Sequence, residues 1–252
     1  MNIRFEDRIV VVTGAAMGFG RSIAQNFAAL GAQVFASDID SAGLQDTARQ
    51  SGIAVRTLDL TKRAMASDWI RDIEQTTGRT IDVLVNNAGG MLGQSHRPIE
   101  HVTDDDWDGI IAVNLNAAFT LCRAAAPGMK RVRSGRIINI SSGAAFRPSR
   151  TRIQAYATAK HAIIGFTRQL AMELGPFGIT VNSVAPGLTL TDSDKQRTWD
   201  EYRAEHRAMI LTNIALGRLG TPQNIADAVV FFASDLSSFV TGQVLPVNGG
   251  SF

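Results

Sequence analysis

The residues that first suggest chemistry are Tyr156 and Lys160, a phenol and an ammonium four positions apart. Apolar spacing predicts a helix over residues 154–174, and positions i and i+4 of a helix lie on one face, so the two side chains can meet. An ammonium beside a phenol favours the phenolate and lowers the phenol pKa from about 10, which suits a general base near neutral pH. Such a pair also arises by chance on helix surfaces, so its meaning depends on the rest of the chain.

A second candidate site lies near the amino end, where Gly14, Gly18 and Gly20 follow an apolar run over residues 8–13. A helical pattern begins at residue 21, so the glycines occupy a strand-to-helix turn. At such a turn, backbone N–H groups and the positive end of the helix bind the pyrophosphate of a dinucleotide. This placement favours a dinucleotide site over an ordinary tight turn.

The acidic residue Asp38 ends the next predicted strand, 18 residues after Gly20. Its carboxylate can accept hydrogen bonds from the ribose hydroxyls of an adenosine moiety. It would repel a 2′-phosphate by about 1–4 kcal/mol at contact distance, depending on the effective dielectric. Ala15, Ala16 and Ile39 supply no compensating cation, so the sequence predicts NAD in preference to NADP.

Strand-like and helix-like segments alternate along the chain. Short apolar runs typical of covered parallel strands are followed by segments whose apolar residues recur at helical spacing. The predicted strands are residues 8–13, 32–38, 53–58, 81–86, 136–141, 179–184 and 244–247, and the predicted helices are residues 21–30, 42–50, 64–77, 104–130, 154–174 and 222–233. Since no repeat or linker interrupts it, this alternation predicts a single doubly wound α/β domain over residues 1–252, with right-handed crossovers.

The composition excludes several classes of partner and site. The 252 residues include 25 Lys and Arg and 23 Asp and Glu, and a net charge of +2 gives no basis for a nucleic-acid or anionic-membrane partner. The single cysteine, Cys122, excludes an internal disulfide and fits a reducing compartment. The histidines at 96, 101, 161 and 206 lack metal-ligand spacing, so no metal is predicted. Neither a signal peptide nor a membrane span is predicted, and we therefore expect a soluble, cytoplasmic protein.

Motifs spread over the whole chain resemble those of the short-chain dehydrogenase/reductase family. In chain order they are Thr13-Gly-x-x-x-Gly-x-Gly20, Asn86-Asn-Ala-Gly89, Asn114, Ser141-Ser142, Tyr156-x-x-x-Lys160, Pro186-Gly187 and Asn248-Gly-Gly250. Several motifs in one order are far more specific than any single motif. The resemblance implies a Rossmann-like fold with a seven-stranded parallel sheet flanked by helices, and an assembly that is a homotetramer or a dimer, of which we expect the homotetramer.

The resemblance also implies catalytic roles. Tyr156 would be the acid/base, Ser142 would hydrogen-bond the substrate oxygen, and Lys160 would bind the nicotinamide ribose while lowering the pKa of Tyr156. Asn114 would anchor a water-linked proton path to Lys160. These roles match the needs of alcohol oxidation, namely a base for the hydroxyl proton, donors for the developing alkoxide and a nicotinamide held against the C–H bond.

For the cofactor, the resemblance extends the site beyond the glycine turn and Asp38. Asp59 matches a position beside the adenine amine, although an Asp before a helix is also an ordinary cap. Thr191 matches a residue that contacts the nicotinamide carboxamide or a phosphate, although it could instead cap a helix. The full predicted cofactor set is Gly14, Met17, Gly18, Phe19, Gly20, Asp38, Asp59, Leu60, Asn87, Ala88, Gly89, Tyr156, Lys160, Pro186, Gly187, Thr189 and Thr191.

One departure from the family pattern concerns the serine. The family commonly has one residue fewer between the catalytic Ser and the Tyr than separates Ser142 from Tyr156. The intervening loop therefore carries an extra residue, and Ser141 and Ser142 are both candidates. We prefer Ser142 because the family usually uses the second serine of this pair.

The loop between Ser142 and Tyr156 also holds Arg147, Arg150 and Arg152. Loops at the carboxyl ends of strands bind ligands in open α/β sheets, so we predict a substrate site formed by these five residues. The arginines could clamp a carboxylate or recognise the hydroxyls of a sugar-derived substrate. The alternative is that they are solvated or make subunit contacts.

Together these features predict an NAD-dependent oxidoreductase that transfers a hydride between nicotinamide and a secondary alcohol or ketone, with a sugar or sugar acid as the expected substrate class. Residues 188–216 would form a mobile substrate lid. One alternative is a reductase of 3-oxoacyl thioesters, an activity of related sequences, although Asp38 opposes the NADPH that this reaction usually implies. An alternative of another class is a non-catalytic dinucleotide-sensing protein, which the intact catalytic set opposes.

Overall fold

The strand β1 (Ile9–Thr13) lies inside the sheet and is buried along its whole length. Val10 and Val12 belong to one hydrophobic core, whereas Ile9 and Val11 belong to a second core. A strand covered on both faces needs apolar side chains at successive positions, which explains its sequence pattern. The computed structural model describes residues 3–49, 52–93, 96–148 and 151–251.

Seven parallel strands form the sheet, in the order β3-β2-β1-β4-β5-β6-β7. The other six are β2 (Gln33–Asp38), β3 (Ala54–Thr57), β4 (Val83–Asn86), β5 (Gly135–Ile140), β6 (Ile179–Pro186) and β7 (Val244–Val247). The order reverses between β1 and β4, and ligands of open α/β sheets bind at the carboxyl ends of strands beside such a reversal. The predicted doubly wound α/β fold and its seven-stranded parallel sheet are confirmed.

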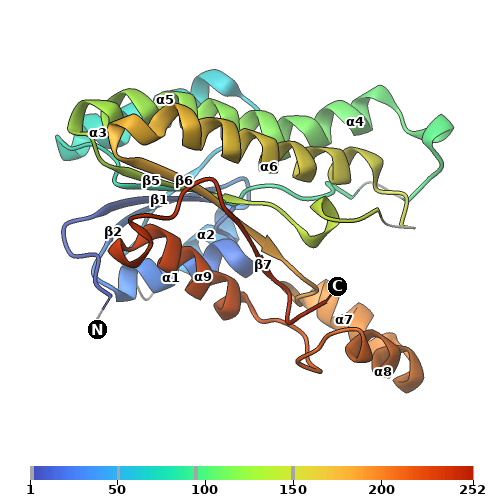
Figure 1. Cartoon of the computed structure of the whole chain (residues 1–252). Coiled ribbons are helices and arrows are strands. Elements are labelled where there is room, and N and C mark those ends of the chain that lie inside the picture. The colour runs from blue at the N-terminus through green and yellow to red at the C-terminus, as the bar shows by residue number, and fades with distance from the viewer. Residues whose placement is uncertain (1–2, 50–51, 94–95, 149–150, 252) are drawn as a thin grey trace.

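Helices cover both faces of the sheet (Figure 1). On one face lie α3 (Arg63–Thr77), α5 (Ala117–Val132) and α6 (Gln154–Leu174), and on the other lie α1 (Gly18–Ala29), α2 (Ser41–Ala48) and α9 (Pro222–Ala233). Trp69 and Ile73 of α3 are buried in one core, and Phe27 of α1 is buried in the other. Each helix thus buries one apolar face, as its spacing predicts.

The predicted helix over residues 104–130 is interrupted. α4 (Asp104–Ile111) continues through a π-helical turn, η2 (Ala112–Asn116), into α5. Within this turn Asn114 is buried. Such π-turns inside helices occur frequently at functional sites.

The sequence predicted no membrane span, but the continuous helix Asp104–Val132 is long and apolar enough to cross a membrane, by length and composition only. In the fold, its residues Leu121, Ala125 and Met129 are fully buried in the core that also contains α3. Core packing therefore explains the apolar character of this helix.

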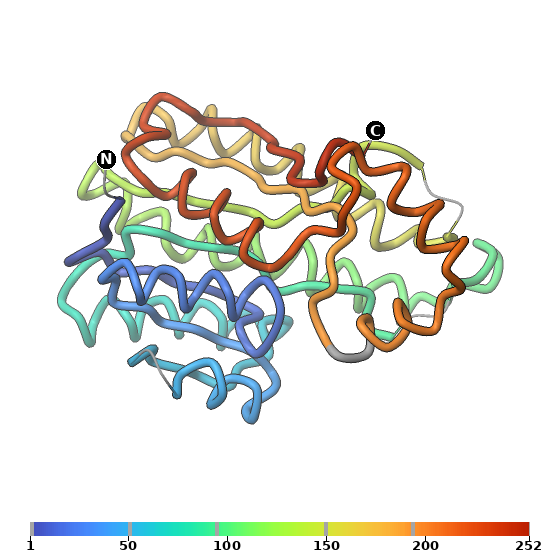
Figure 2. The backbone as a smooth tube through the Cα atoms, turned by 90° about the horizontal axis from the view of Figure 1, so that it is seen from below, coloured from blue at the N-terminus to red at the C-terminus, as the bar shows by residue number. Residues whose placement is uncertain are grey.

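Two helices that the sequence did not predict lie between β6 and α9. They are α7 (Ser193–Glu201) and α8 (Ala204–Thr212), and both project at the end of the molecule where the C-terminus also lies (Figures 1 and 2). Asp192 caps α7 by accepting a hydrogen bond from the Lys195 N–H at 2.8 Å. No described residue of α8 is buried, so this segment has no core-facing stripe from which a helix could be predicted.

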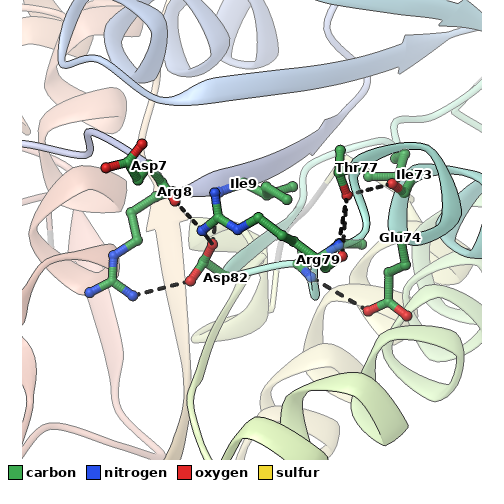
Figure 3. A network of polar contacts seen from close by, with 9 residues as sticks. Asp7, Arg8, Ile9, Ile73, Glu74, Thr77, Arg79 and Asp82 are labelled. Carbon is green, nitrogen blue, oxygen red and sulfur yellow. Dashed lines mark hydrogen bonds and ion pairs between the residues drawn. The ribbon is translucent and has the colours of Figure 1, made fainter.

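A polar network joins the opposite, amino-terminal ends of β1 and β4 (Figure 3). The Asp82 carboxylate accepts hydrogen bonds from the Arg8 guanidinium at 3.1 Å and from the Ile9 N–H at 2.8 Å. The Arg79 guanidinium lies 3.8 Å from the oxygen that Ile9 contacts. These contacts hold the starts of the two strands together and so help to position their carboxyl ends, where the candidate site lies.

Candidate active site

The glycine turn between β1 and α1 lies against the loop that follows β4. A Cβ atom added at Gly14 would lie 2.8 Å from the Ala88 Cα, and one added at Gly20 would overlap the Gly14 carbonyl oxygen. Gly14 and Gly18 have φ values of +67° and +53°, a region that favours glycine. The backbone of the turn can therefore approach a ligand closely at the amino end of α1.

Thr13 and Asn87 bond the glycine turn to that loop. The Thr13 hydroxyl accepts hydrogen bonds from the N–H groups of Asn87 and Ala88, each at 3.0 Å. The Asn87 side-chain amide donates to the carbonyl oxygens of Thr13 and Gly14 at 2.9 and 3.0 Å. These four bonds hold the two loops side by side at the carboxyl ends of neighbouring strands.

Asp38 ends β2 and borders a cavity of about 470 Å³ beside the glycine turn, which we call the Asp38 cavity. One oxygen of its carboxylate accepts from the Ala16 N–H at 2.9 Å, and the other accepts from the Asp40 N–H at 3.1 Å. Asp59 and Leu60 border the same cavity, together with Asp40. Among the described residues that line it, none is Lys or Arg. The charged side chains among these lining residues are therefore carboxylates.

Arg21 and Thr61 bond residues beside this cavity, and of the two only Thr61 is among its lining residues. Arg21 donates to the carbonyl oxygens of Ala16 and Gly43 and thereby ties the glycine turn to α2. Hydrogen bonds from the hydroxyl and the N–H of Thr61 hold the pKa of Asp59 below its usual value. Asp59 therefore bonds the turn before α3 and does not cap the helix, whose N-cap position is Lys62. Its place in the lining of the cavity is compatible with the predicted cofactor role, which stays a prediction.

Tyr156 and Lys160 lie on one face of α6 and border a second cavity of about 380 Å³, which we call the Tyr156 cavity. The Lys160 ammonium nitrogen lies 5.6 Å from the centre of the Tyr156 ring and donates to the Ile140 carbonyl oxygen at 2.9 Å. Ser142, just after β5, hydrogen-bonds the Tyr156 side chain. The structure thus brings Ser142, Tyr156 and Lys160 together beside the glycine turn.

Burial dominates the protonation of this pair. It raises the pKa of Tyr156 despite the opposing hydrogen bond from Ser142, and it lowers the pKa of Lys160 to about 8. The ammonium faces the ring and the Ile140 carbonyl. Burial outweighs the opposing contact at the phenol, and the expected lowering of the Tyr156 pKa by Lys160 stays a prediction.

Asn114 reaches the same region from the π-turn. Its amide nitrogen donates to the carbonyl oxygens of Gly90 and Ile110 at 2.8 and 3.0 Å, and its oxygen accepts from the Gly90 N–H at 3.0 Å. A Cβ atom at Gly89 would overlap the Asn114 oxygen and lie 3.3 Å from the Lys160 nitrogen. Asn114 and Lys160 therefore approach each other at Gly89, and the water-linked path between them stays a prediction.

The two adjacent serines have different surroundings. Ser141 is buried, and its hydroxyl donates to the Lys160 carbonyl oxygen at 2.9 Å. The Ser142 hydroxyl accepts from the Ala144 N–H at 3.1 Å and also contacts Tyr156. This geometry favours Ser142 as the serine that faces a substrate.

The remaining predicted cofactor residues also line these cavities. Met17, Gly18, Phe19, Asn87, Gly89, Pro186, Gly187, Thr189 and Thr191 border the Tyr156 cavity, and Ala88 borders the Asp38 cavity. Asp192 and Lys195, which were not predicted as site residues, border the Tyr156 cavity as well. They come from the start of α7, and no recognised motif marked them.

A third cavity, of about 1040 Å³, extends from Ser142 toward α8 and the C-terminal segment, and we call it the substrate groove. Its apolar lining consists of Phe146, Pro186, Leu188, Ile210, Ile214 and Pro246. Asn248 and Ser251 also border it. Most of these residues are distant in sequence from Ser142 and carry no motif of their own, so only the fold identifies them as neighbours.

The predicted substrate arginines occupy different places. Arg147 borders the substrate groove and donates to the Ser251 hydroxyl at 3.2 Å. Arg152 is exposed and is not among the described residues that border the groove, so its predicted substrate role loses support. Arg150 lies outside the described residues.

Comparison with known proteins gives matches over nearly the whole chain. The profile of the family described as enoyl-(acyl carrier protein) reductase matches residues 14–251. The chain is 38% identical over 250 residues to 3-oxoacyl-[acyl-carrier-protein] reductase FabG of Salmonella typhimurium, and the alignment covers 98% of each chain. It is also 38% identical to (2S)-[(R)-hydroxy(phenyl)methyl]succinyl-CoA dehydrogenase subunit BbsD of Thauera aromatica, over 97% of this chain and 96% of the relative.

A solved structure agrees with these matches. It is a protein of Beutenbergia cavernae, provisionally described as an NAD(P)-dependent gluconate 5-dehydrogenase with bound NADP at low occupancy. The TM-score is 0.88 at 36% identity, and the alignment covers 99% of this chain and 98% of that one. The protein therefore belongs to the short-chain dehydrogenase/reductase family and is an oxidoreductase that uses a nicotinamide dinucleotide.

Proposed function

We propose that the protein interconverts 3-oxoacyl and 3-hydroxyacyl groups carried as thioesters, with NAD(H) as its cofactor. The observation that carries the substrate class is the substrate groove of about 1040 Å³, which borders Ser142 and has a largely apolar lining. Each methylene of an acyl chain that is buried there contributes about 0.8 kcal/mol. FabG and BbsD, whose names state acyl-carrier-protein and CoA substrates, support the same class. This proposal replaces the expected sugar substrate with the alternative that the sequence had left open.

In this proposal, Tyr156 moves a proton to or from the substrate oxygen, while Ser142 hydrogen-bonds the same oxygen. The nicotinamide supplies or accepts the hydride. Lys160 and Asn114 approach each other at Gly89 and would link the phenol to solvent through water. A positively charged nicotinamide beside the phenol would favour the phenolate and oppose the effect of burial on the Tyr156 pKa.

The preference for NAD rests on the Asp38 cavity. The glycine turn offers backbone N–H groups at the amino end of α1 to the pyrophosphate, and Asp38 can accept hydrogen bonds from the adenosine ribose. Asp38, Asp40 and Asp59 together make the cavity unfavourable for a 2′-phosphate. The bound NADP of the Beutenbergia cavernae protein belongs to that protein, so the cofactor of this chain needs its own measurement.

The test is a turnover assay with 3-oxoacyl-CoA thioesters of increasing chain length, each with NADH and with NADPH. We expect turnover with NADH and a kcat/KM that rises with chain length as the groove fills. Ser142→Ala should lower kcat strongly, whereas the matched Ser141→Ala variant should mainly lower stability, since the Ser141 hydroxyl donates to the α6 backbone. Turnover of sugar acids without any turnover of thioesters would contradict the proposal.

One observation favours a second candidate, oxidation of a sugar acid. Arg147 places a guanidinium in the substrate groove, where it could pair with a carboxylate, and the Beutenbergia cavernae protein is described as acting on gluconate. The same assay run with aldonic acids and NAD distinguishes this candidate. A loss of aldonic-acid activity in Arg147→Met would support it.

We further propose that the protein is a cytoplasmic homotetramer. Phe239 is fully exposed, Leu245 lies on the edge strand β7, and Phe119 is exposed on α5, so apolar surface is available for subunit contacts. Light scattering should give a mass of four 27.1-kDa chains.

A further inference from the structure

Lys195 lies at the edge of the Tyr156 cavity, in the first turn of α7. Its ammonium nitrogen lies 2.6 Å from the Thr191 hydroxyl and 3.2 Å from the Asp192 carboxylate. The Thr191 hydroxyl in turn donates to Asp192 at 2.9 Å. Thr191, Asp192 and Lys195 thus form a hydrogen-bonded triad that faces the cavity from α7.

This triad lies directly against the glycine turn. A Cβ atom at Gly18 would lie 2.9 Å from the Thr191 Cβ and 3.2 Å from the Thr191 carbonyl oxygen. Gly18 begins α1, whose amino end is the place for the dinucleotide pyrophosphate. Since the Lys195 ammonium is hydrogen-bonded to Thr191, it lies beside the position that the phosphates would take.

The pyrophosphate of a dinucleotide carries two negative charges, and the glycine turn supplies no side-chain cation. Met17 and Phe19 are uncharged. Arg21, in the first turn of α1, donates to Ala16, Gly43 and Thr47 and is not among the described residues that border the Tyr156 cavity. Among the described residues that border the Tyr156 cavity, the cations are Lys160 and Lys195. Lys160 is buried beneath the catalytic Tyr156 and bonds the Ile140 carbonyl, which leaves Lys195 for the phosphates.

Asp192 holds Lys195 in place but also competes for it. Burial alone would raise the pKa of Asp192, but hydrogen bonds from the Lys195 N–H, the Thr191 hydroxyl and the Lys195 ammonium hold it below its usual value. Asp192 is therefore ionised at neutral pH and partly neutralises Lys195. An anion that enters the cavity must draw Lys195 away from this carboxylate.

We propose that Lys195 is a ligand of the cofactor pyrophosphate and exchanges its contact with Asp192 for a phosphate oxygen when the dinucleotide binds. The inference rests on the nicotinamide dinucleotide of the proposed function and deepens the description of its site. It also joins α7 to the bound cofactor, so cofactor binding would fix the start of the segment 188–216 over the cavity.

The two members of the ion pair make opposite predictions. Lys195→Met removes the cation and leaves Asp192 unpaired beside the phosphates, so NADH binding should weaken about 10-fold, and Lys195→Arg should restore it. Asp192→Asn keeps an oxygen that can cap α7 but removes the competing charge, so NADH should bind as tightly as to wild type or more tightly. If the ion pair only stabilised the local fold, both variants would bind NADH more weakly, and to a similar degree.

The measurement is a fluorescence titration of each full-length variant with NADH at two salt concentrations. Lys130→Met is the matched control, because Lys130 also pairs with a carboxylate at 3.2 Å, that of Glu173, but it does not border the cofactor cavities. Weaker binding and a smaller salt dependence in Lys195→Met, with no loss in Asp192→Asn, would support the inference.

Equal losses in Lys195→Met and Asp192→Asn, or wild-type affinity in Lys195→Met, would overturn it while leaving the proposed function intact. Failure of wild-type protein to bind NADH would instead overturn the cofactor assignment itself. Thermal unfolding of each variant shows whether a weaker affinity comes from a loss of folded protein.

Discussion

Protonation at the site is controlled by how deeply each side chain is buried. Tyr156 and Lys160 were predicted as a pair from their spacing, and α6 does place them on one face. The directions of their pKa shifts could not be predicted from the spacing, because they depend on burial by segments that are distant in the sequence. Ile140 in β5 accepts a hydrogen bond from the Lys160 ammonium, and Gly89 in the loop after β4 lies beside it.

The buried ammonium predicts a specific pH dependence of stability. The pKa of Lys160 is near 10.5 when unfolded and about 8 when folded, so between these values only the unfolded chain holds the proton. The free energy of unfolding should therefore rise with pH from about 8 to about 10.5, by roughly 3 kcal/mol in all. Below pH 8 the destabilisation that comes from burying the charged ammonium is fully present.

Urea unfolding of wild type and Lys160→Met from pH 7 to 10 measures this effect. The variant should be the more stable protein at pH 7, and the difference should shrink as the pH rises. A difference that does not change with pH would show that Lys160 keeps its ordinary pKa in the folded chain.

Asp38 predicts the choice of cofactor. Asp38→Ala removes the carboxylate that would repel the 2′-phosphate of NADPH. The ratio of kcat/KM for NADH over NADPH should therefore fall at least about tenfold. Asp46→Ala is the matched control, because Asp46 is an α2 acid that pairs with Arg49 and lies outside the Asp38 cavity. An unchanged ratio in Asp38→Ala would assign the preference to another group.

Among the elements, the glycine turn was the most predictable and α7 and α8 the least. Glycines at a strand-to-helix junction predict a backbone turn with positive φ angles, and Gly14 and Gly18 do have positive φ values. In contrast, no described residue of α7 or α8 is buried, so neither helix has the core-facing apolar stripe from which the other helices were predicted. The π-turn at Asn114 was also missed, because its apolar neighbours continue an ordinary helical spacing.

The glycine turn predicts that one added methyl group abolishes tight cofactor binding. In Gly20→Ala the new Cβ would overlap the Gly14 carbonyl oxygen, so the turn must shift away from its close approach to a ligand. NADH affinity should fall more than about tenfold while α1 stays folded. Ser22→Ala, in the same helix, should bind as wild type, and wild-type affinity in Gly20→Ala would show that the turn does not hold the cofactor.

For the whole molecule, the sheet could be predicted because parallel strands covered on both faces have a distinctive apolar pattern. The substrate groove could not, since it forms only where the loop after β5, the segment around α8 and the residues after β7 meet in space. The family motifs surround the cofactor, whereas the residues that choose the substrate lie in these other segments. This division explains why the reaction class followed from the sequence and the expected sugar substrate did not.

The central claim is that Tyr156 delivers the proton in hydride transfer between NAD(H) and a thioester-bound keto group. The most direct measurement compares wild type and Tyr156→Phe in NADH oxidation by a 3-oxoacyl-CoA thioester, together with the Kd for NADH. We predict that Tyr156→Phe lowers kcat/KM by about 10²–10⁴-fold and changes the Kd for NADH by less than about twofold. Wild-type turnover by Tyr156→Phe would contradict the claim.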